Sequence, residues 1–150
     1  MAGLHFEDWE VDEELETPGR TISEADVMLF AGLTGDYNRV HTDEAFASKS
    51  LFGKRIAHGL LGLAIGFGLF MRMGYITDML KGAYLGLHQD FTAPIFLGDS
   101  ITGKVRVASK KETKRGDAGI ITFVLSLFNQ KGEEVQRGEH TLLFSKREIT

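Results

Sequence analysis

A carboxylate and an imidazole lie five positions apart in the polar cluster that runs from Asp36 to His41. Such a pair can orient and deprotonate a water molecule, because the imidazole shares the proton while the carboxylate carries the negative charge. Asp36 and His41 are therefore a candidate base and its partner. Asn38 lies between them, and we expect its side chain to support the turn by bonding to backbone groups about two residues away.

A glycine opens the next apolar segment, at the end of the run Arg55-Ile56-Ala57-His58-Gly59. Backbone N–H groups in the first turn of a helix have no partner within the helix, and that end carries a partial positive charge. The Gly59 N–H is therefore a candidate donor to negative charge that develops on a carbonyl oxygen. In acyl-transfer sites the loss of such a donor costs on the order of 3 to 4 kcal/mol of transition-state stabilisation.

Each of these residues also has a structural explanation. An Asp near an Asn in a turn is more often a capping residue than a catalytic one, and His41 could simply begin a helix. For His58 we predict the structural role, in which it fixes the loop that presents Gly59. The basic stretch Lys110–Arg115 is either a solvated turn or a contact for phosphate groups of a carrier, with Lys54 and Arg55 as rivals for that contact.

The elements that must position these groups are predicted to be helices first and strands later. Ser23 is a good N-cap for a helix that ends near Gly35, and a short second helix begins at Thr42–Glu44. These boundaries place His41 in the connection between two helices. The segment Ile56–Met71 is almost wholly apolar but shorter than the roughly 18 to 20 residues that a bilayer demands, so it predicts a buried helix.

That apolar segment contains an unusual number of glycines, each of which costs about 0.5 to 1 kcal/mol in a helix interior relative to alanine. A sheet that presses closely on the helix would explain them. Four strand-like runs follow, separated by turn residues, at 85–91, 101–107, 120–128 and 134–144. The pattern predicts an α+β fold, with an antiparallel sheet around one buried helix and an edge strand open to a second copy.

Composition limits the remaining possibilities. The 150 residues suit a single domain over 1–150, and a net charge of −4 argues against nucleic acid as a partner. With no cysteine, disulfides, thiolate zinc sites and a cysteine nucleophile are excluded. The N-terminus lacks a basic start followed by an apolar run, so we expect a cytoplasmic protein that neither enters nor crosses a membrane. Three scattered histidines lack metal-site spacing and receive no role: His5, His88 and His140.

Taken together, the motifs resemble the MaoC-like hydratase/dehydratase family, which includes the (R)-specific enoyl-CoA hydratases. The resemblance extends over nearly the whole chain. It rests on the runs Thr21–Asp26 and Phe30–Asp36, on Asn38 and His41, on Arg55–Gly59, and on Phe91–Pro94 with Gly98-Asp99. It implies a hot-dog fold, in which an antiparallel sheet wraps around a long central helix and a helical overhang carries the catalytic loop.

The resemblance also implies roles for the residues. Asp36 and His41 would activate the water that adds to C3 of a trans-2-enoyl thioester, and the Gly59 N–H would bind the thioester oxygen. No metal or other cofactor is implied, because coenzyme A is the handle of the substrate. The partners expected are the acyl-CoA substrate and a second copy of the chain, paired through the sheet edges.

Two departures from the family pattern stand out. Arg39 occupies a position where the family usually has a proline, so the loop gains a charge that can face solvent or a substrate phosphate. In the run Ile65–Gly68, several members present a serine to the site, whereas this chain has Phe67, which could fill part of the acyl pocket and favour short chains.

Two other functions fit the same scaffold. An acyl-CoA thioesterase would direct the activated water at the thioester carbonyl, and a non-catalytic acyl-CoA binding module would keep the fold without turnover. The paired Asp36 and His41 favour the hydratase over both alternatives.

Overall fold

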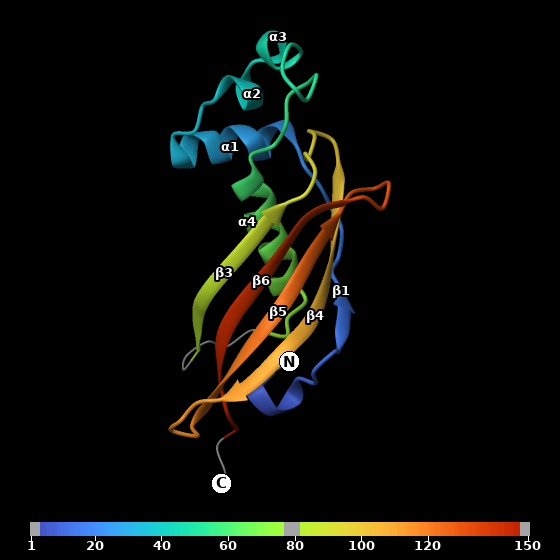
Figure 1. Cartoon of the computed structure of the whole chain (residues 1–150). Coiled ribbons are helices and arrows are strands. Elements are labelled where there is room, and N and C mark those ends of the chain that lie inside the picture. Colours follow the sequence, from blue (N-terminus) through green and yellow to red (C-terminus); the bar gives the residue numbers. More distant parts are fainter. Residues whose placement is uncertain (1–3, 77–81, 148–150) are drawn as a thin grey trace.

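The computed structural model describes residues 4–76 and 82–147, which form one antiparallel sheet, a long helix against it and a group of shorter helices (Figure 1). The sheet order is β1-β4-β5-β6-β3, and β2 also pairs with β4. The strands are β1 (Glu14–Glu16), β2 (Arg20–Thr21), β3 (Ala83–Phe91), β4 (Ser100–Glu112), β5 (Ala118–Phe128) and β6 (Glu134–Ser145). The predicted antiparallel sheet is confirmed, and β3 lies at its edge.

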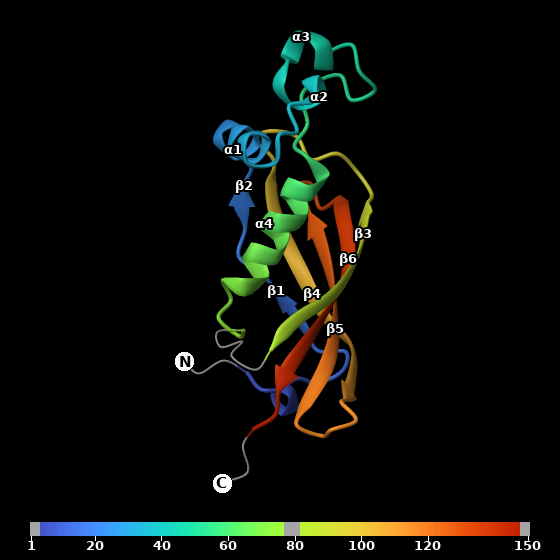
Figure 2. The same ribbon diagram turned by 90° about the vertical axis from the view of Figure 1, so that its left-hand side faces the viewer.

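Helix α4 (Gly59–Met71) lies against one face of the sheet, as Figure 2 shows. Apolar side chains from both elements are buried in one core, among them Leu61 and Ile65 of α4 and Leu125 and Leu127 of β5. The glycines of α4 permit this close approach. A Cβ added at Gly66 would lie 2.6 Å from the Leu127 side chain, and one at Gly62 would meet Gln136. At Gly68, by contrast, an added Cβ would meet nothing within 4 Å among the described residues, so close packing there does not explain that glycine.

Three helices form an overhang beyond one end of the sheet: α1 (Glu24–Thr34), α2 (Arg39–Thr42) and α3 (Glu44–Ala47) (Figure 1). Ser23 caps α1 as predicted, since its hydroxyl accepts from the Asp26 N–H and the Asp26 carboxylate accepts from the Ser23 N–H. Gly35 ends the helix with a φ of 79°, a left-handed conformation that glycine adopts at low cost. The first helix of the overhang therefore begins and ends at capping residues.

Two details of the sequence prediction were wrong. His41 lies within the short helix α2, not in a connection between helices, because the Asn38 side chain caps a helical turn there. Nothing in the sequence indicated this turn, since its residues have no apolar periodicity. The strands β1 and β2 were missed, since they span three and two residues and are stabilised by pairing with β4. Within the described residues no helix is both long and apolar enough to cross a membrane, and the cytoplasmic location stays a prediction.

Candidate active site

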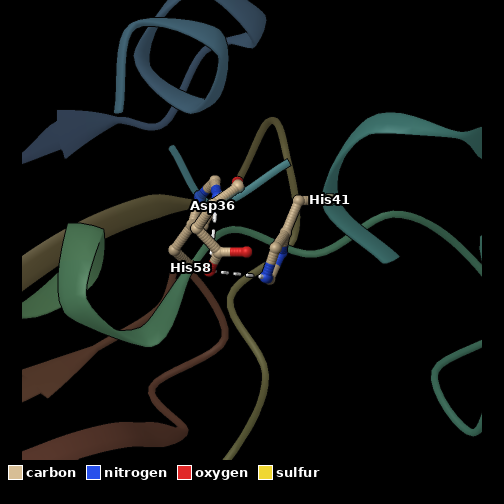
Figure 3. A group of neighbouring side chains, drawn as sticks. All are labelled: Asp36, His41 and His58. Carbon is tan, nitrogen blue, oxygen red and sulfur yellow. Dashed lines mark hydrogen bonds and ion pairs between the residues drawn. The ribbon is translucent and has the colours of Figure 1, made fainter. Parts of the chain in front are cut away.

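Asp36 and His41 lie side by side in the overhang (Figure 3), where Oδ2 of Asp36 is 4.0 Å from Nε2 of His41. The loop between them is held by an Asx turn, in which the Asn38 N–H donates to Asp36 Oδ1 over 3.2 Å. Asn38 in turn caps α2, because its Oδ1 accepts from the Val40 N–H, also over 3.2 Å. The predicted bonding of Asn38 to the backbone two residues away is confirmed.

The tautomer of His41 follows from its second ring nitrogen. Nδ1 lies 2.8 Å from the carbonyl oxygen of Ile56, which can only accept, so Nδ1 carries the proton and Nε2 presents a lone pair. Burial lowers the pKa of His41, and this effect outweighs the opposing hydrogen bond to Ile56. His41 is therefore a neutral imidazole at pH 7, with its basic nitrogen toward the Asp36 carboxylate.

The separation of 4.0 Å between Asp36 and His41 is too long for a direct hydrogen bond but suits a bridging water. A water oxygen about 2.8 Å from each atom would donate one proton to the carboxylate and the other to Nε2. The His41 side chain is mostly buried, whereas that of Asp36 is half exposed, so the water can exchange with solvent. This geometry can hold and deprotonate one water molecule.

His58 links this pair to the start of α4. Its Nε2 donates to the backbone carbonyl of Asp36 over 2.9 Å, and its ring stacks on that of His41 at 3.8 Å between centroids. Nδ1 of His58 is buried and has no partner among the described residues. The placement fits the predicted structural role, in which His58 joins the catalytic loop to the residue before Gly59.

A carboxylate and two imidazoles so close together could also hold a metal ion, since one ligand atom from each of Asp36, His41 and His58 lies within 4.8 Å of the others. A metal needs a lone pair from each imidazole. The Nε2 of His58, however, is bonded as a donor to the Asp36 carbonyl. The donor set therefore suits a water better than a three-ligand metal centre, and the absence of a metal from the mechanism stays a prediction.

Arg55 connects the overhang helices to each other. Its Nε donates to the backbone carbonyl of His41 over 2.7 Å, and its two terminal nitrogens donate to the carboxylate of Glu24 over 2.8 and 2.9 Å. No sequence pattern indicated this clamp, because Glu24 and Arg55 are 31 positions apart. Lys54 lies over the ring of Phe96 at 4.2 Å. Binding of substrate phosphates by Lys54 or Arg55 stays a prediction.

Arg39 is held near the same loop. Its guanidinium bonds the Asp43 carboxylate at 2.7 Å and lies over the Phe46 ring at 4.5 Å. The charge faces solvent, since most of this side chain is exposed.

Gly59 begins α4 as predicted, and it lines a cleft of about 550 Å³ together with Phe91, Gln136 and apolar residues such as Ala93, Pro94 and Ile95. The cleft is bounded by the N-terminal end of the helix and by strands β3 and β6. Asp36 and His41 do not line it, and the residue that links them to Gly59 is His58, whose ring bonds the Asp36 carbonyl and stacks on His41. The cleft therefore offers an apolar space beside the candidate oxyanion donor.

Phe67 lies eight residues beyond Gly59 on α4, roughly 12 Å along the helix axis. Its ring packs against Tyr84 and His140, at 5.1 and 5.6 Å between centroids, and it does not line the cleft beside Gly59. A role for Phe67 in limiting the length of the acyl chain stays a prediction.

Comparisons with known proteins fit this geometry. The sequence profile of the MaoC like domain matches residues 7–126. A relative from Aeromonas caviae, named (R)-specific enoyl-CoA hydratase, is 35% identical over 115 residues, which is 77% of this chain and 81% of the relative. The crystal structure of the MaoC-like dehydratase from Rhodospirillum rubrum matches with a TM-score of 0.85 at 27% identity, over 98% of this chain and 100% of that one.

The fold matches more distant proteins as well. A Mycobacterium tuberculosis protein described as having a double hotdog fold matches with a TM-score of 0.84 at 17% identity, over 99% of this chain and 46% of that one. The hot-dog fold that the sequence predicted is therefore confirmed. Because the domain profile covers most of the sequence, the chain belongs to the MaoC-like domain family, which includes hydratases and dehydratases.

Proposed function

We propose that this protein is an (R)-specific enoyl-CoA hydratase, which adds water to trans-2-enoyl-CoA or runs the same reaction in reverse as a 3-hydroxyacyl-CoA dehydratase. One observation supports this above the others. The Asp36 carboxylate and the bare Nε2 of His41 converge at 4.0 Å, next to a helix whose first residue is Gly59. The family and the named hydratase from Aeromonas caviae point the same way.

The reaction follows from the roles of these groups. The water between Asp36 and His41 gives up a proton to the pair, and its oxygen bonds to C3 of the conjugated thioester. The electrons of the double bond move onto the thioester oxygen, where the Gly59 N–H and the positive end of α4 stabilise the enolate. The proton held by the pair then returns to C2. Coenzyme A is part of the substrate, and no other cofactor takes part.

We also propose that the enzyme is a homodimer paired through the edge strand β3. This strand has nine residues and no proline, and its side chains Leu85, Leu87 and Phe91 are about half exposed. A long apolar edge of this kind is open to pairing with another strand. The mass in solution should be twice 16.6 kDa, and the double variant Leu85→Lys with Leu87→Lys should be a monomer by light scattering. A monomeric parent protein would reject the dimer.

The catalytic test uses crotonyl-CoA, and the conjugated enoyl absorbance should disappear with formation of the (R)-alcohol. Asp36→Asn should lower kcat by about 10²-fold or more with unchanged folding, because the amide cannot accept the proton. The matched control is Asp117→Asn, in the turn between β4 and β5, which should keep full activity. An (S)-product, or an active Asp36→Asn, would contradict the mechanism. Release of free thiol from saturated acyl-CoA would indicate the thioesterase instead, and binding without turnover the non-catalytic module.

A further inference from the structure

The first turn of α4 lacks the usual stabilisation of a helix start. The N-cap residue is His58, and its side chain accepts no hydrogen bond from the helix N–H groups. An N-cap side chain typically contributes about 1 kcal/mol. The turn that presents the Gly59 N–H must therefore be held by another contact.

Gln136 makes that contact from the neighbouring sheet. The residue lies on β6 and is 1% exposed, and its Nε2 donates to the carbonyl oxygen of Gly59 over 2.9 Å. Because a carbonyl only accepts, this bond determines which end of the amide faces the helix. The other end, Oε1, accepts from Nε2 of Gln89 on β3 over 3.2 Å. Two amides therefore run in series from the edge strand to the first carbonyl of α4.

Two glycines make room for this chain of amides. A Cβ at Gly62 would collide with Nε2 of Gln136, and a Cβ at Gly138 would collide with Oε1 of Gln89. Gly62 lies on α4, so the side chain of Gln136 crosses the helix surface at a point where only a glycine fits. The glycine of the helix and the amide of the strand are thus complementary.

We propose that Gln136 is a positioning residue, which holds the first turn of α4 through the carbonyl of Gly59 and so keeps the Gly59 N–H aimed at the substrate oxygen. This inference rests on the proposed function of Gly59. In other helices an N-cap side chain stabilises the first turn by accepting from its N–H groups. Here Gln136 stabilises the first turn by donating to its carbonyl. Gln136 also lines the cleft beside Gly59, so the bond lies at the edge of the substrate space.

The test is Gln136→Met, which keeps the volume and removes the hydrogen bonds. We expect kcat on crotonyl-CoA to fall about tenfold while KM changes less than about twofold, because an interaction that matters only in the transition state is weakened. Hydrogen exchange should also accelerate at the Gly62 amide, which donates to the His58 carbonyl across this turn. The matched control is Gln130→Met, which removes an amide bonded to Asp99 in a loop and should leave kcat and the exchange at Gly62 unchanged.

A second variant keeps the proposal testable if Gln136→Met does not fold. Gln136→Glu has the same shape and can donate to Gly59 only when protonated, so its kcat relative to the parent protein should rise as the pH falls. An active parent with a Gln136→Met variant of equal kcat would overturn the positioning role. Faster exchange at Gly62 without loss of kcat would overturn it as well. An inactive parent protein would instead reject the proposed function, and the exchange experiment would still report on the bond.

Discussion

Nδ1 of His41 lies 2.8 Å from the carbonyl oxygen of Ile56, two residues before His58. This bond directs the lone pair of Nε2 toward Asp36 and ties α2 to the segment that leads into α4. A histidine whose second nitrogen donates to a backbone carbonyl has a fixed tautomer and a fixed ring orientation. The contact therefore couples the position of the candidate base to the helix that carries Gly59.

The activity should persist to a lower pH than an ordinary histidine would allow. Only the neutral imidazole of His41 can accept a proton from water, and burial lowers its pKa below the usual value of about 6.5. As the pH falls, kcat/KM should stay constant past that value and decline only below it. The measurement is a pH profile of kcat/KM on crotonyl-CoA. A decline that begins above pH 6.5 would contradict the assignment.

Arg55→Lys should weaken catalysis without a large effect on folding. The guanidinium bonds the His41 carbonyl and both carboxylate oxygens of Glu24 at once, which a lysine ammonium cannot do. We expect kcat to fall about tenfold, because small displacements of a catalytic group cost that much or more. Steady-state kinetics with a thermal melt would measure both effects. Arg106→Lys, which alters an exposed ion pair with Asp12, is the control and should behave like the parent.

The parts of the molecule that the sequence predicted are those with a local signal. The cap at Ser23, the turn at Gly35 and the apolar run of α4 are all set by neighbours within a few positions. The contacts between distant segments had no such signal. The bond from Arg55 to Glu24 and the bond from Gln136 to Gly59 join residues 31 and 77 positions apart. Only the fold brings these side chains together, so one sequence could suggest candidate reacting groups but not the residues that hold them.

Folding stability should decrease as the pH falls from neutrality toward 4. His140 is 1% exposed, and burial lowers its pKa to about 4. As the pH falls, the His140 imidazole takes up a proton near pH 6.5 in the unfolded chain but only at a lower pH in the folded protein. The stability is therefore fully present above about pH 6.5 and is lost as the pH falls below it. For His140 alone the loss is at most about 3 kcal/mol.

Urea unfolding at pH 7 and at pH 4.5 would measure this loss. His140→Phe keeps an aromatic ring against Phe67 and removes the titrating nitrogens, one of which bonds the Tyr84 hydroxyl. In His140→Phe the difference between the two pH values should therefore shrink. The control is His88→Asn at an exposed position, in which the difference between the two pH values should be the same as in the parent protein. An unchanged pH dependence in His140→Phe would assign the effect to other groups.

Gly59→Ala should lower activity through Phe91. A Cβ at position 59 would lie 2.8 Å from two carbons of the Phe91 ring, and both residues line the cleft beside the proposed oxyanion donor. The half-exposed ring can move, so folding is kept. The displaced ring should then crowd the substrate oxygen, and kcat/KM should fall about 10²-fold, as when an oxyanion donor is lost.

The same helix offers a matched control for that variant. In the part of the chain that the structure describes, a Cβ at Gly68 has nothing within 4 Å, so Gly68→Ala should stabilise the protein by about 0.5 to 1 kcal/mol with unchanged kinetics. A second substitution, Phe91→Ala, should restore part of the activity of Gly59→Ala, because it removes the ring that the new methyl displaces. If Gly59→Ala and Gly68→Ala have the same kcat/KM, the first residue of α4 does not bind the reacting thioester, and the oxyanion donor must be sought elsewhere in the cleft.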